Sequence, residues 1–331
     1  MWNYALRRLV YMFVTLWVLS FVVFVIIQLP PGDYLSSYIA SRQAQGDSFD
    51  DAAIAALRRQ YGLDGPFIYQ YWKWITNFLQ GDMGRSFEWN QPVTTLLGER
   101  LPLTVVLSVS TLVLTYAIAI PIGVYSALKQ YSIGDYVFST IGFIGLAIPN
   151  FMLALILMYL FFKYFGLSVG GLFSDEYATA PWSLAKVGDL INHLWIPMIV
   201  IGTAGTAGLI RIMRGSLLDE LGKQYVVTAR AKGVRERRLI FRYPVRIAIN
   251  PIVSTIGWQL PNIVSGETIV AIVLSLPTTG PLLFRALLSQ DMYLAGSIVL
   301  MLGVLTLIGT FISDVLLVIV DPRISFEKKA Q

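Results

Sequence analysis

The stretch LPLTVVLSVSTLVLTYAIAIPIGVYSAL, Leu101 to Leu128, decides the class of this protein because it contains no charged side chain. A helix needs roughly 20 apolar residues to cross the hydrocarbon core of a bilayer. A charge at the centre of such a helix costs about 2.5–3.5 kcal/mol, whereas a leucine contributes only about 0.3–0.6 kcal/mol in favour of insertion. A charge-free run of this length therefore predicts a membrane-spanning helix.

Five other runs share this character in a chain of 331 residues that is 56% hydrophobic and 14% charged. The six predicted spans are Leu9–Gly32, Leu101–Leu128, Tyr136–Phe162, Leu190–Ile210, Ile247–Gly266 and Met292–Ser313, the last continuing past Asp314 to Val320. Each is expected to be helical, since in lipid a helix satisfies its own backbone polar groups. The first run is too long for a signal peptide, so we expect it to be retained. The sequence predicts an all-α membrane protein with six spans.

The distribution of basic residues predicts the orientation. With the N-terminus inside, segments 1–8, 129–135, 211–246 and 321–331 hold 16 lysines and arginines, against 3 in the short outer segments 163–189 and 267–291. The outer segment 33–100 is too long to count fully, and short loops rich in Lys and Arg stay in the cytoplasm. Both termini are therefore expected to be cytoplasmic.

The long outer segment has two parts. FDDAAIAALRRQYGLDGP, residues 49–66, reads as an amphipathic helix stopped by Gly62 and Pro66. The next part carries the closely spaced aromatic residues Tyr69, Tyr71, Trp72 and Trp74. We expect these to form an interfacial aromatic belt, a position that Trp and Tyr favour; the alternative is that some of them line a vestibule for a solute.

The most polar run is YVVTARAKGVRERRLIFRYPVR, Tyr225–Arg246, within a segment 211–246 that has ten basic and three acidic side chains. Its apolar spacing predicts a helix that ends at Gly233, followed by a second short helix. Most connections are about 2–8 residues long, so this segment is much longer than a turn requires. Its charge can hold the loop inside and contact anionic lipid. Alternatively it docks a soluble partner, with small residues that let two backbones approach.

This run, extended to YVVTARAKGVRERRLIFRYPVRIAINPIV, resembles the cytoplasmic EAA loop of ABC-transporter permeases of the dipeptide/oligopeptide/nickel group. Other stretches resemble the same family in order: ALRRLVYMFVTLWVLSFVVFVIIQLPPGD, LRRQYGLDGP, QGDMGRSF, QPVTTLLGERLPLTVVLS and DPRIS. The resemblance covers nearly the whole chain.

The resemblance implies a type I ABC importer permease fold with a first helix and cytoplasmic end in 1–32, an extracytoplasmic loop region in 33–100, a permease core in 101–321 and a tail in 322–331. It implies a second similar permease chain, two ATPase subunits that bind ATP and Mg²⁺, and an extracytoplasmic solute-binding protein as partners. In the family the EAA loop forms the coupling helix in a groove of the ATPase. The matching positions here are Tyr225, Thr228, Ala229, Arg230, Ala231, Lys232 and Gly233.

The chain departs from the family pattern at four positions. Tyr243 stands where a histidine is usual, Ala271 where a glutamate is usual, Thr278 where a glycine is usual and Thr310 where an asparagine is common. Pro244 is expected to start or kink the returning helix.

Candidate residues for the translocation pathway are few. Pro149 and Asn150 lie in the middle of the third predicted span, where a kink is expected, and Asn150 is a pore-lining candidate. Glu267 and Asp314 are the acids at or inside the span boundaries, and ionisable groups there are functional candidates by default. The glycines of GTAGTAGLIR, spaced by three, predict a face for close helix packing. His193, beside Trp195, is expected at the interface rather than in a catalytic site.

Several functions are excluded or disfavoured. The chain has no cysteine, which rules out disulfides and thiolate metal sites. It has no G-x-x-x-x-G-K-[ST] motif, so we expect no ATPase activity and no cofactor on this chain. The alternatives to an importer subunit are a self-sufficient secondary transporter or channel, which usually shows buried charges or inverted repeats, and a membrane scaffold. For an importer, a peptide is the expected solute, and an oligosaccharide or nickel chelate is the alternative.

Overall fold

The computed structural model describes residues 2–28, 39, 54–56, 58–59, 65–86, 88–167 and 169–320. These form two units: one made of Leu103–Gly280 with the chain from Thr306 onward, the other of Trp2–Pro102 with Pro281–Leu305. We call them the core unit and the outer-loop unit. Of the amphipathic helix predicted for 49–66, the structure describes only residues 54–56 and 58–59, which are helical, and 65–66. The closing DPRIS motif lies outside the described residues.

The outer-loop unit contains the first helix and the short elements that follow it. They are α1 (Trp2–Gln28), α4 (Phe67–Leu79), β1 (Arg85–Ser86) and β2 (Gln91–Pro92), with α14 (Thr279–Leu288) and the first parts of α5 (Val93–Leu128) and α15 (Met292–Val320). The two strands pair antiparallel, with Arg85 opposite Pro92.

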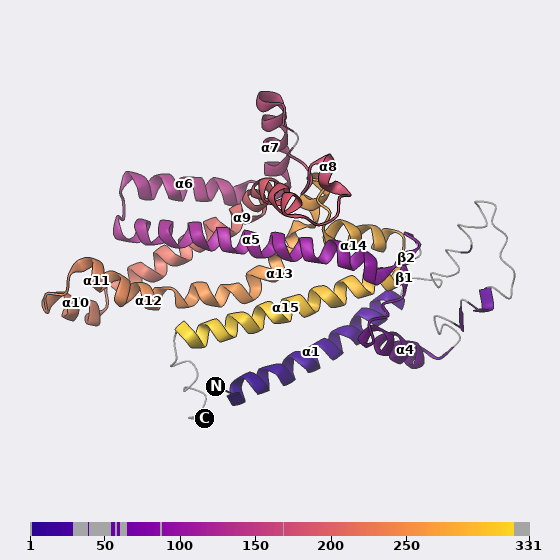
Figure 1. The fold of residues 1–331 in the computed structure, drawn as a ribbon. Coiled ribbons are helices and arrows are strands. Elements are labelled where there is room, and N and C mark those ends of the chain that lie inside the picture. The colour runs from indigo at the N-terminus through magenta and orange to yellow at the C-terminus, as the bar shows by residue number, and fades with distance from the viewer. Residues whose placement is uncertain are drawn as a thin grey trace. The chain divides into compact units, whose positions relative to one another are not determined.

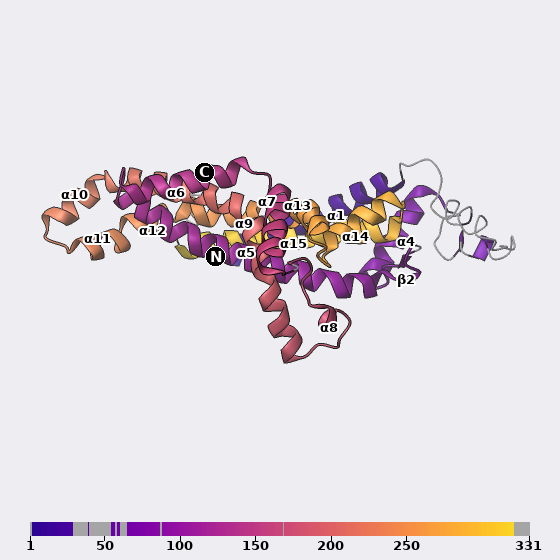
Figure 2. The same cartoon turned by 90° about the horizontal axis from the view of Figure 1, so that it is seen from above.

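The core unit is built around the long helix α9 (Leu184–Leu221), which packs against four of its neighbours (Figure 1). These are α6 (Ile133–Ala147), α7 (Asn150–Phe165), α12 (Pro244–Ala248) and α13 (Asn250–Val273). The unit also contains α8 (Asp175–Ala178), α10 (Gln224–Ala231), α11 (Glu236–Arg242) and the remaining parts of α5 and α15. Figures 1 and 2 both show α10 and α11 at one end of this unit, beyond the end of α6.

Four helices of the described chain are long and apolar enough to cross a membrane: Leu6–Ile26, Val93–Leu128, Leu184–Leu221 and Tyr293–Ile319. They cover the first, second, fourth and sixth predicted spans. The fifth predicted span, Ile247–Gly266, corresponds to α12 and α13 with a break at Ile249. Because α13 carries polar residues such as Gln259 and Asn262, it is less apolar than the other four.

The third predicted span, Tyr136–Phe162, is not one kinked helix. It is two helices, α6 and α7, bent by 104° at a break of two residues. Ile148 has extended backbone angles, φ −85° and ψ 122°, because a residue before proline is pushed out of the helical region. Pro149 then caps the start of α7. In Figures 1 and 2 α7 projects away from the axis of α6 in both views.

Two apolar clusters hold the core unit together. One joins α5, α7, α9 and α13 through Leu107, Ala154, Val200 and Val270. The other joins the end of α9 to the short helices, with Leu217, Val226, Leu239 and Ile252 fully buried. Because fully burying an aliphatic side chain contributes about 1.5–3 kcal/mol, the second cluster fixes α10 and α11 to the body of the unit.

The aromatic residues of α4 do not form one belt. Tyr71 is 2% exposed and Trp74 is 8% exposed, and both pack against Phe24 of α1. The Tyr71 hydroxyl also shares a 2.9 Å hydrogen bond with Ser20. Tyr69 and Trp72 lie on the other face of the helix and are exposed. The amphipathic spacing of α4 therefore gives Tyr71 and Trp74 a packing role within the chain, and the interfacial placement of Tyr69 and Trp72 stays a prediction.

Candidate functional site

The helix α10 covers most of the positions that the EAA resemblance singled out. Val226 is completely buried in the second apolar cluster, and Tyr225 and Ala229 are partly buried beside it. Thr228 and Ala231 lie on the opposite face and are exposed. Because residues three and four apart share a face of a helix, α10 is anchored on one side and presents a surface of small side chains on the other.

The end of α10 is set by Gly233, as its sequence predicted. Gly233 has φ +75°, a left-handed conformation that costs other L-residues about 1–2 kcal/mol. Its N–H donates to the carbonyl of Arg230 at 3.0 Å, and the N–H of Val234 donates to the carbonyl of Ala229 at 3.3 Å. This pair of bonds is the Schellman ending of a helix. The chain turns sharply after Lys232, and the carbonyls of Ala229 and Arg230 still accept hydrogen bonds.

Side-chain bonds tie α10 to both of its neighbours. The Tyr225 hydroxyl donates to Glu220 in the last turn of α9 at 2.5 Å. Burial first, and this bond second, raise the pKa of Tyr225 above its usual value. Arg230 donates through two nitrogens to Glu236 at the start of α11. The bond to Arg230 holds the pKa of Glu236 below its usual value.

The chain returns through α11 and α12. Tyr243, the residue where the family usually has histidine, lies at the junction with φ −116° and ψ −79° and is exposed. Pro244 occupies the first turn of α12, where its missing N–H leaves no helical bond unmade. The prediction that Pro244 starts the returning helix is confirmed.

A second candidate site is a cavity of about 360 Å³ in the core unit. Its polar lining consists of Thr115 from α5, Asn150 from the first turn of α7 and Gln259 from α13. Apolar side chains and the glycines of α9 form the rest of the wall. Asn150 follows the bend at Pro149 and lines this partly open cavity, and its pore-lining role stays a prediction.

The glycine face predicted for GTAGTAGLIR is found at two of its three positions. A Cβ atom on Gly202 would come within 2.9 Å of the Thr115 hydroxyl, and one on Gly205 would overlap the Gln259 side chain. Gly208 has open space where a Cβ would stand. Gly202 and Gly205 therefore permit close approach of α5 and α13 to α9, as small residues do in membrane proteins.

The remaining candidates lie apart from this cavity. Asp314 is partly buried in α15, and the side chain of Glu267 lies outside the described residues. Thr310 donates to the carbonyl of Gly257 at 3.3 Å, which links α15 to α13. Ala271 and Thr278 are buried. His193 bonds the carbonyl of Asp189, one turn earlier in its own helix.

Sequence reasoning missed one ion pair. Arg214 of α9 donates to both carboxylate oxygens of Asp135 in α6, at 2.9 and 2.8 Å, and the Asp135 side chain is only 4% exposed. The N–H of Tyr131 also donates to this carboxylate. Asp135 lies one residue before the predicted third span and Arg214 lies after the fourth, and nothing in their local sequence indicates that they meet.

Metal binding finds no support in the part of the chain that the structure describes. That part contains no group of three or more His, Asp or Glu side chains placed to hold an ion.

Comparisons with known proteins identify the family. Residues 119–326 match the model described as "Binding-protein-dependent transport system inner membrane component", and residues 1–108 match the model of its N-terminal part.

Three relatives cover almost the full length. The oligopeptide transport system permease protein AppB of Bacillus subtilis is 34% identical over 98% of this chain and 99% of the relative. The inner membrane ABC transporter permease protein YejB of Escherichia coli O157:H7 is 29% identical over 98% and 99%. The glutathione transport system permease protein GsiC of Pectobacterium atrosepticum is 30% identical over 99% and 100%.

These matches confirm the family that the EAA loop indicated and decide against a self-sufficient transporter, a channel or a scaffold. Permease subunits of this family are not enzymes, because the ATPase activity of the import system lies in separate subunits. The helical, membrane-spanning architecture is that of the type I importer permeases. The chain belongs to the inner-membrane permease components of binding-protein-dependent ABC import systems.

Proposed function

We propose that this chain forms part of the translocation pathway of an importer for peptide-type solutes, with both termini in the cytoplasm and α10 as the element on which an ATPase acts. Its partners are a second permease chain, two ATPase subunits that bind ATP and Mg²⁺, and an extracytoplasmic binding protein. The names of the relatives, which include oligopeptide and glutathione permeases, support the peptide class.

The observation that carries the coupling role is the shape of α10. Val226 anchors the helix, while Thr228 and Ala231 face outward beside the open turn at Gly233. Small side chains let a second backbone come close. Arg230 and Lys232 are exposed at the same end of the helix.

Movement of α10 would be passed to the membrane-spanning helices through the second apolar cluster. In that cluster Val226 is grouped with Leu217 of α9, Leu239 of α11 and Ile252 of α13. Close-packed interiors transmit displacement rather than absorb it. A push on α10 therefore reaches α9 and α13, two of the helices that line the cavity.

The lining of the cavity is suited to binding an uncharged polar group of the solute. Its lining includes the amides of Asn150 and Gln259 and the hydroxyl of Thr115, and no ionisable side chain. Amides both donate and accept hydrogen bonds, as does a peptide backbone. The oligosaccharide alternative is less well supported, since Tyr71 and Trp74, two of the aromatic residues that suggested sugar stacking, are packed against α1. Pro149 and Asn150 are thus the preferred pathway candidates over Glu267 and Asp314.

Crosslinking tests the coupling role directly, because the chain has no cysteine of its own. Thr228→Cys in the assembled importer should form a crosslink with an ATPase subunit. Tyr131→Cys, exposed in the turn between α5 and α6, is the matched control and should form few. Equal capture at both positions would remove the assignment.

Uptake assays test the mechanism. Ala231→Trp places a bulky side chain on the outward face of α10 and should abolish uptake of a labelled oligopeptide while the chain still inserts. Wild-type uptake in this variant would contradict the proposal. A thermal-shift screen of the cognate binding protein with peptides and oligosaccharides decides the solute class, and a response to oligosaccharides alone would overturn the peptide proposal.

A further inference from the structure

The helix α11 carries an arginine surface that the coupling role does not use. Arg235, Arg237, Arg238 and Arg242 line an open depression of about 1030 Å³, together with Phe241. Gly233, Val234 and Tyr243 complete its lining. All four arginines are exposed. We refer to these four residues as the arginine surface.

Within the described chain, none of these four guanidinium groups has a hydrogen bond or an ion pair. The nearest acid in sequence, Glu236, is already bound by Arg230. Four guanidinium groups within one eight-residue segment, without a counter-charge from the described chain, make this segment strongly positive. The surface is therefore built to receive an anion from outside the chain.

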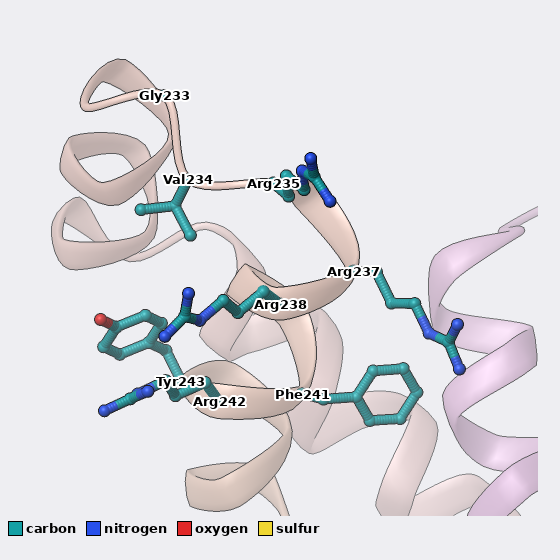
Figure 3. A pocket seen from close by; sticks show the side chains of 8 residues that line it. All are labelled: Gly233, Val234, Arg235, Arg237, Arg238, Phe241, Arg242 and Tyr243. Carbon is teal, nitrogen blue, oxygen red and sulfur yellow. The ribbon is translucent and has the colours of Figure 1, made fainter.

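The arginines are held on a fixed support. Leu239 is completely buried and Ile240 is 8% exposed in the second apolar cluster. In Figure 3, Arg237 and Phe241 project from one side of α11, while Arg238, Arg242 and Tyr243 project from the other. The positive charge thus surrounds the exposed part of the helix rather than lining one narrow slot.

This arrangement favours an extended anionic surface over a small soluble anion. Small-molecule sites usually enclose most of the ligand, whereas the side chains around this depression are almost all exposed. A single phosphate ion could contact the arginines on only one side of α11. Several lipid headgroups lying side by side could contact the arginines on both sides of the helix.

Aromatic exposure points the same way. Phe241 is 57% exposed and lies one turn after Arg237. Tyr243 and Ile247 are also exposed, and Pro244 begins the return to α13. Aromatic side chains at the level of lipid headgroups are favourable, and clustered basic residues next to a span attract anionic lipid.

We propose that the arginine surface of α11 binds the phosphate headgroups of anionic phospholipids, with Phe241 inserted between them. The ligand class is a phosphodiester-bearing lipid. The site shares Gly233 with the end of α10 but includes neither Thr228 nor Ala231 of its outward face. The proposal does not depend on the coupling role of α10.

The test is photocrosslinking at one position in nanodiscs with equal amounts of phosphatidylglycerol and phosphatidylcholine. The photoreactive p-benzoylphenylalanine replaces Phe241 in the full chain, both alone and in the assembled importer, and captured lipid is identified by mass. We expect phosphatidylglycerol to be captured in preference. Arg238→Gln with Arg242→Gln should lower that preference by about thirtyfold, and raised salt should weaken it.

The matched control is Lys129→Gln with Lys223→Gln, which removes the same charge from exposed positions that do not line the depression and that the coupling role does not use. It should leave lipid capture unchanged. Equal capture of both lipids, or no effect of the arginine changes, would overturn the proposal. Loss of capture on replacing chloride by inorganic phosphate at constant ionic strength would instead identify a soluble phosphate as the ligand. Capture of an ATPase subunit in place of lipid in the assembled importer would identify a protein interface, and either result rejects the lipid site.

Discussion

The α10–α12 loop and the α6–α7 pair both redirect the chain sharply beside α9, but different forces set their shapes. In the loop the turn follows from one glycine, two backbone hydrogen bonds and one proline, all within a few residues of each other. In the α6–α7 pair, Pro149 permits the break through its own backbone. The contacts of α7 with α9 and α13 form only when the whole unit folds. Local chemistry determines the first shape, and packing between distant segments contributes to the second.

Removing the long-range ion pair of α6 should have the largest effect. Asp135→Asn leaves Arg214 without its bidentate partner, and removing one member of a buried pair costs roughly 3–5 kcal/mol. We expect the lower end of that range because Arg214 is 26% exposed. Thermal unfolding of the purified chain in detergent measures the loss.

Two variants make this result specific. Arg214→Lys keeps the charge but cannot bind both oxygens in a fork, so its loss should be intermediate. Lys129→Ala changes an exposed residue in the same turn and should stay within about 0.5 kcal/mol. If Asp135→Asn were as stable as Lys129→Ala, α6 would not depend on this pair, and the contrast with the loop would weaken.

The local character of the loop is tested at Gly233. Gly233→Ala forces a residue with a Cβ atom into φ +75°, at a cost of about 1–2 kcal/mol. In Gly233→Ala, hydrogen exchange at the amides of residues 232–234 should accelerate by about 5–30-fold. Exchange at the amide of Gly222 should not change. Gly222→Ala is the control, because the nearest atom to its added Cβ is 3.8 Å away. Equal protection in both variants would show that the cluster around Val226, not the glycine, sets the end of α10.

The cause of the α6–α7 bend can be measured as a distance. Spin labels at Tyr136→Cys and Phe162→Cys, both exposed, would be about 39 Å apart along a straight helix and much closer in the bent pair. Pro149→Ala lifts the restriction on Ile148, so we expect a minor population at long distance. The contacts of α7 with α9 and α13 should keep the bent form dominant. Pro121→Ala, a proline change inside α5, is the control and should not alter the distances. If Pro149→Ala also left them unchanged, the bend would be caused entirely by the contacts of α7 with other helices.

The difference between features set by the local sequence and features set by packing of distant segments explains what the sequence could predict. Charge-free runs identified α1, α5, α9 and α15, since the cost of a charge in lipid is a property of composition. Gly233 and Pro244 marked the loop boundaries, since their backbone limits act within the residue itself. The EAA resemblance located α10 as a candidate surface.

Other features depend on partners far away in the chain. The 104° bend has apolar residues on both sides, so hydropathy could not distinguish a kink from a break. The burial of Tyr71 and Trp74 depends on α1, and the meeting of Asp135 with Arg214 depends on how α6 packs on α9. The cavity at Asn150 follows from the bend and from two glycines of α9, so its lining was beyond any local pattern.

The exposed pair between Arg230 and Glu236 should have the smallest effect, although it joins two helices of the loop. Ion pairs in water are screened by salt and by solvent, so Glu236→Gln should leave the unfolding temperature unchanged at neutral pH. Arg230 lowers the pKa of Glu236 in the folded chain. Any stabilisation is therefore fully present above the unfolded pKa and is lost as pH falls through the lowered folded value. Loss of stability between pH 8 and pH 6 in the wild-type chain, but not in Glu236→Gln, would contradict this account, because a carboxyl group with a lowered pKa does not titrate in that range. That result would mean that Glu236 is not held in its charged form by Arg230 and would require a revised account of how α10 is held to α11.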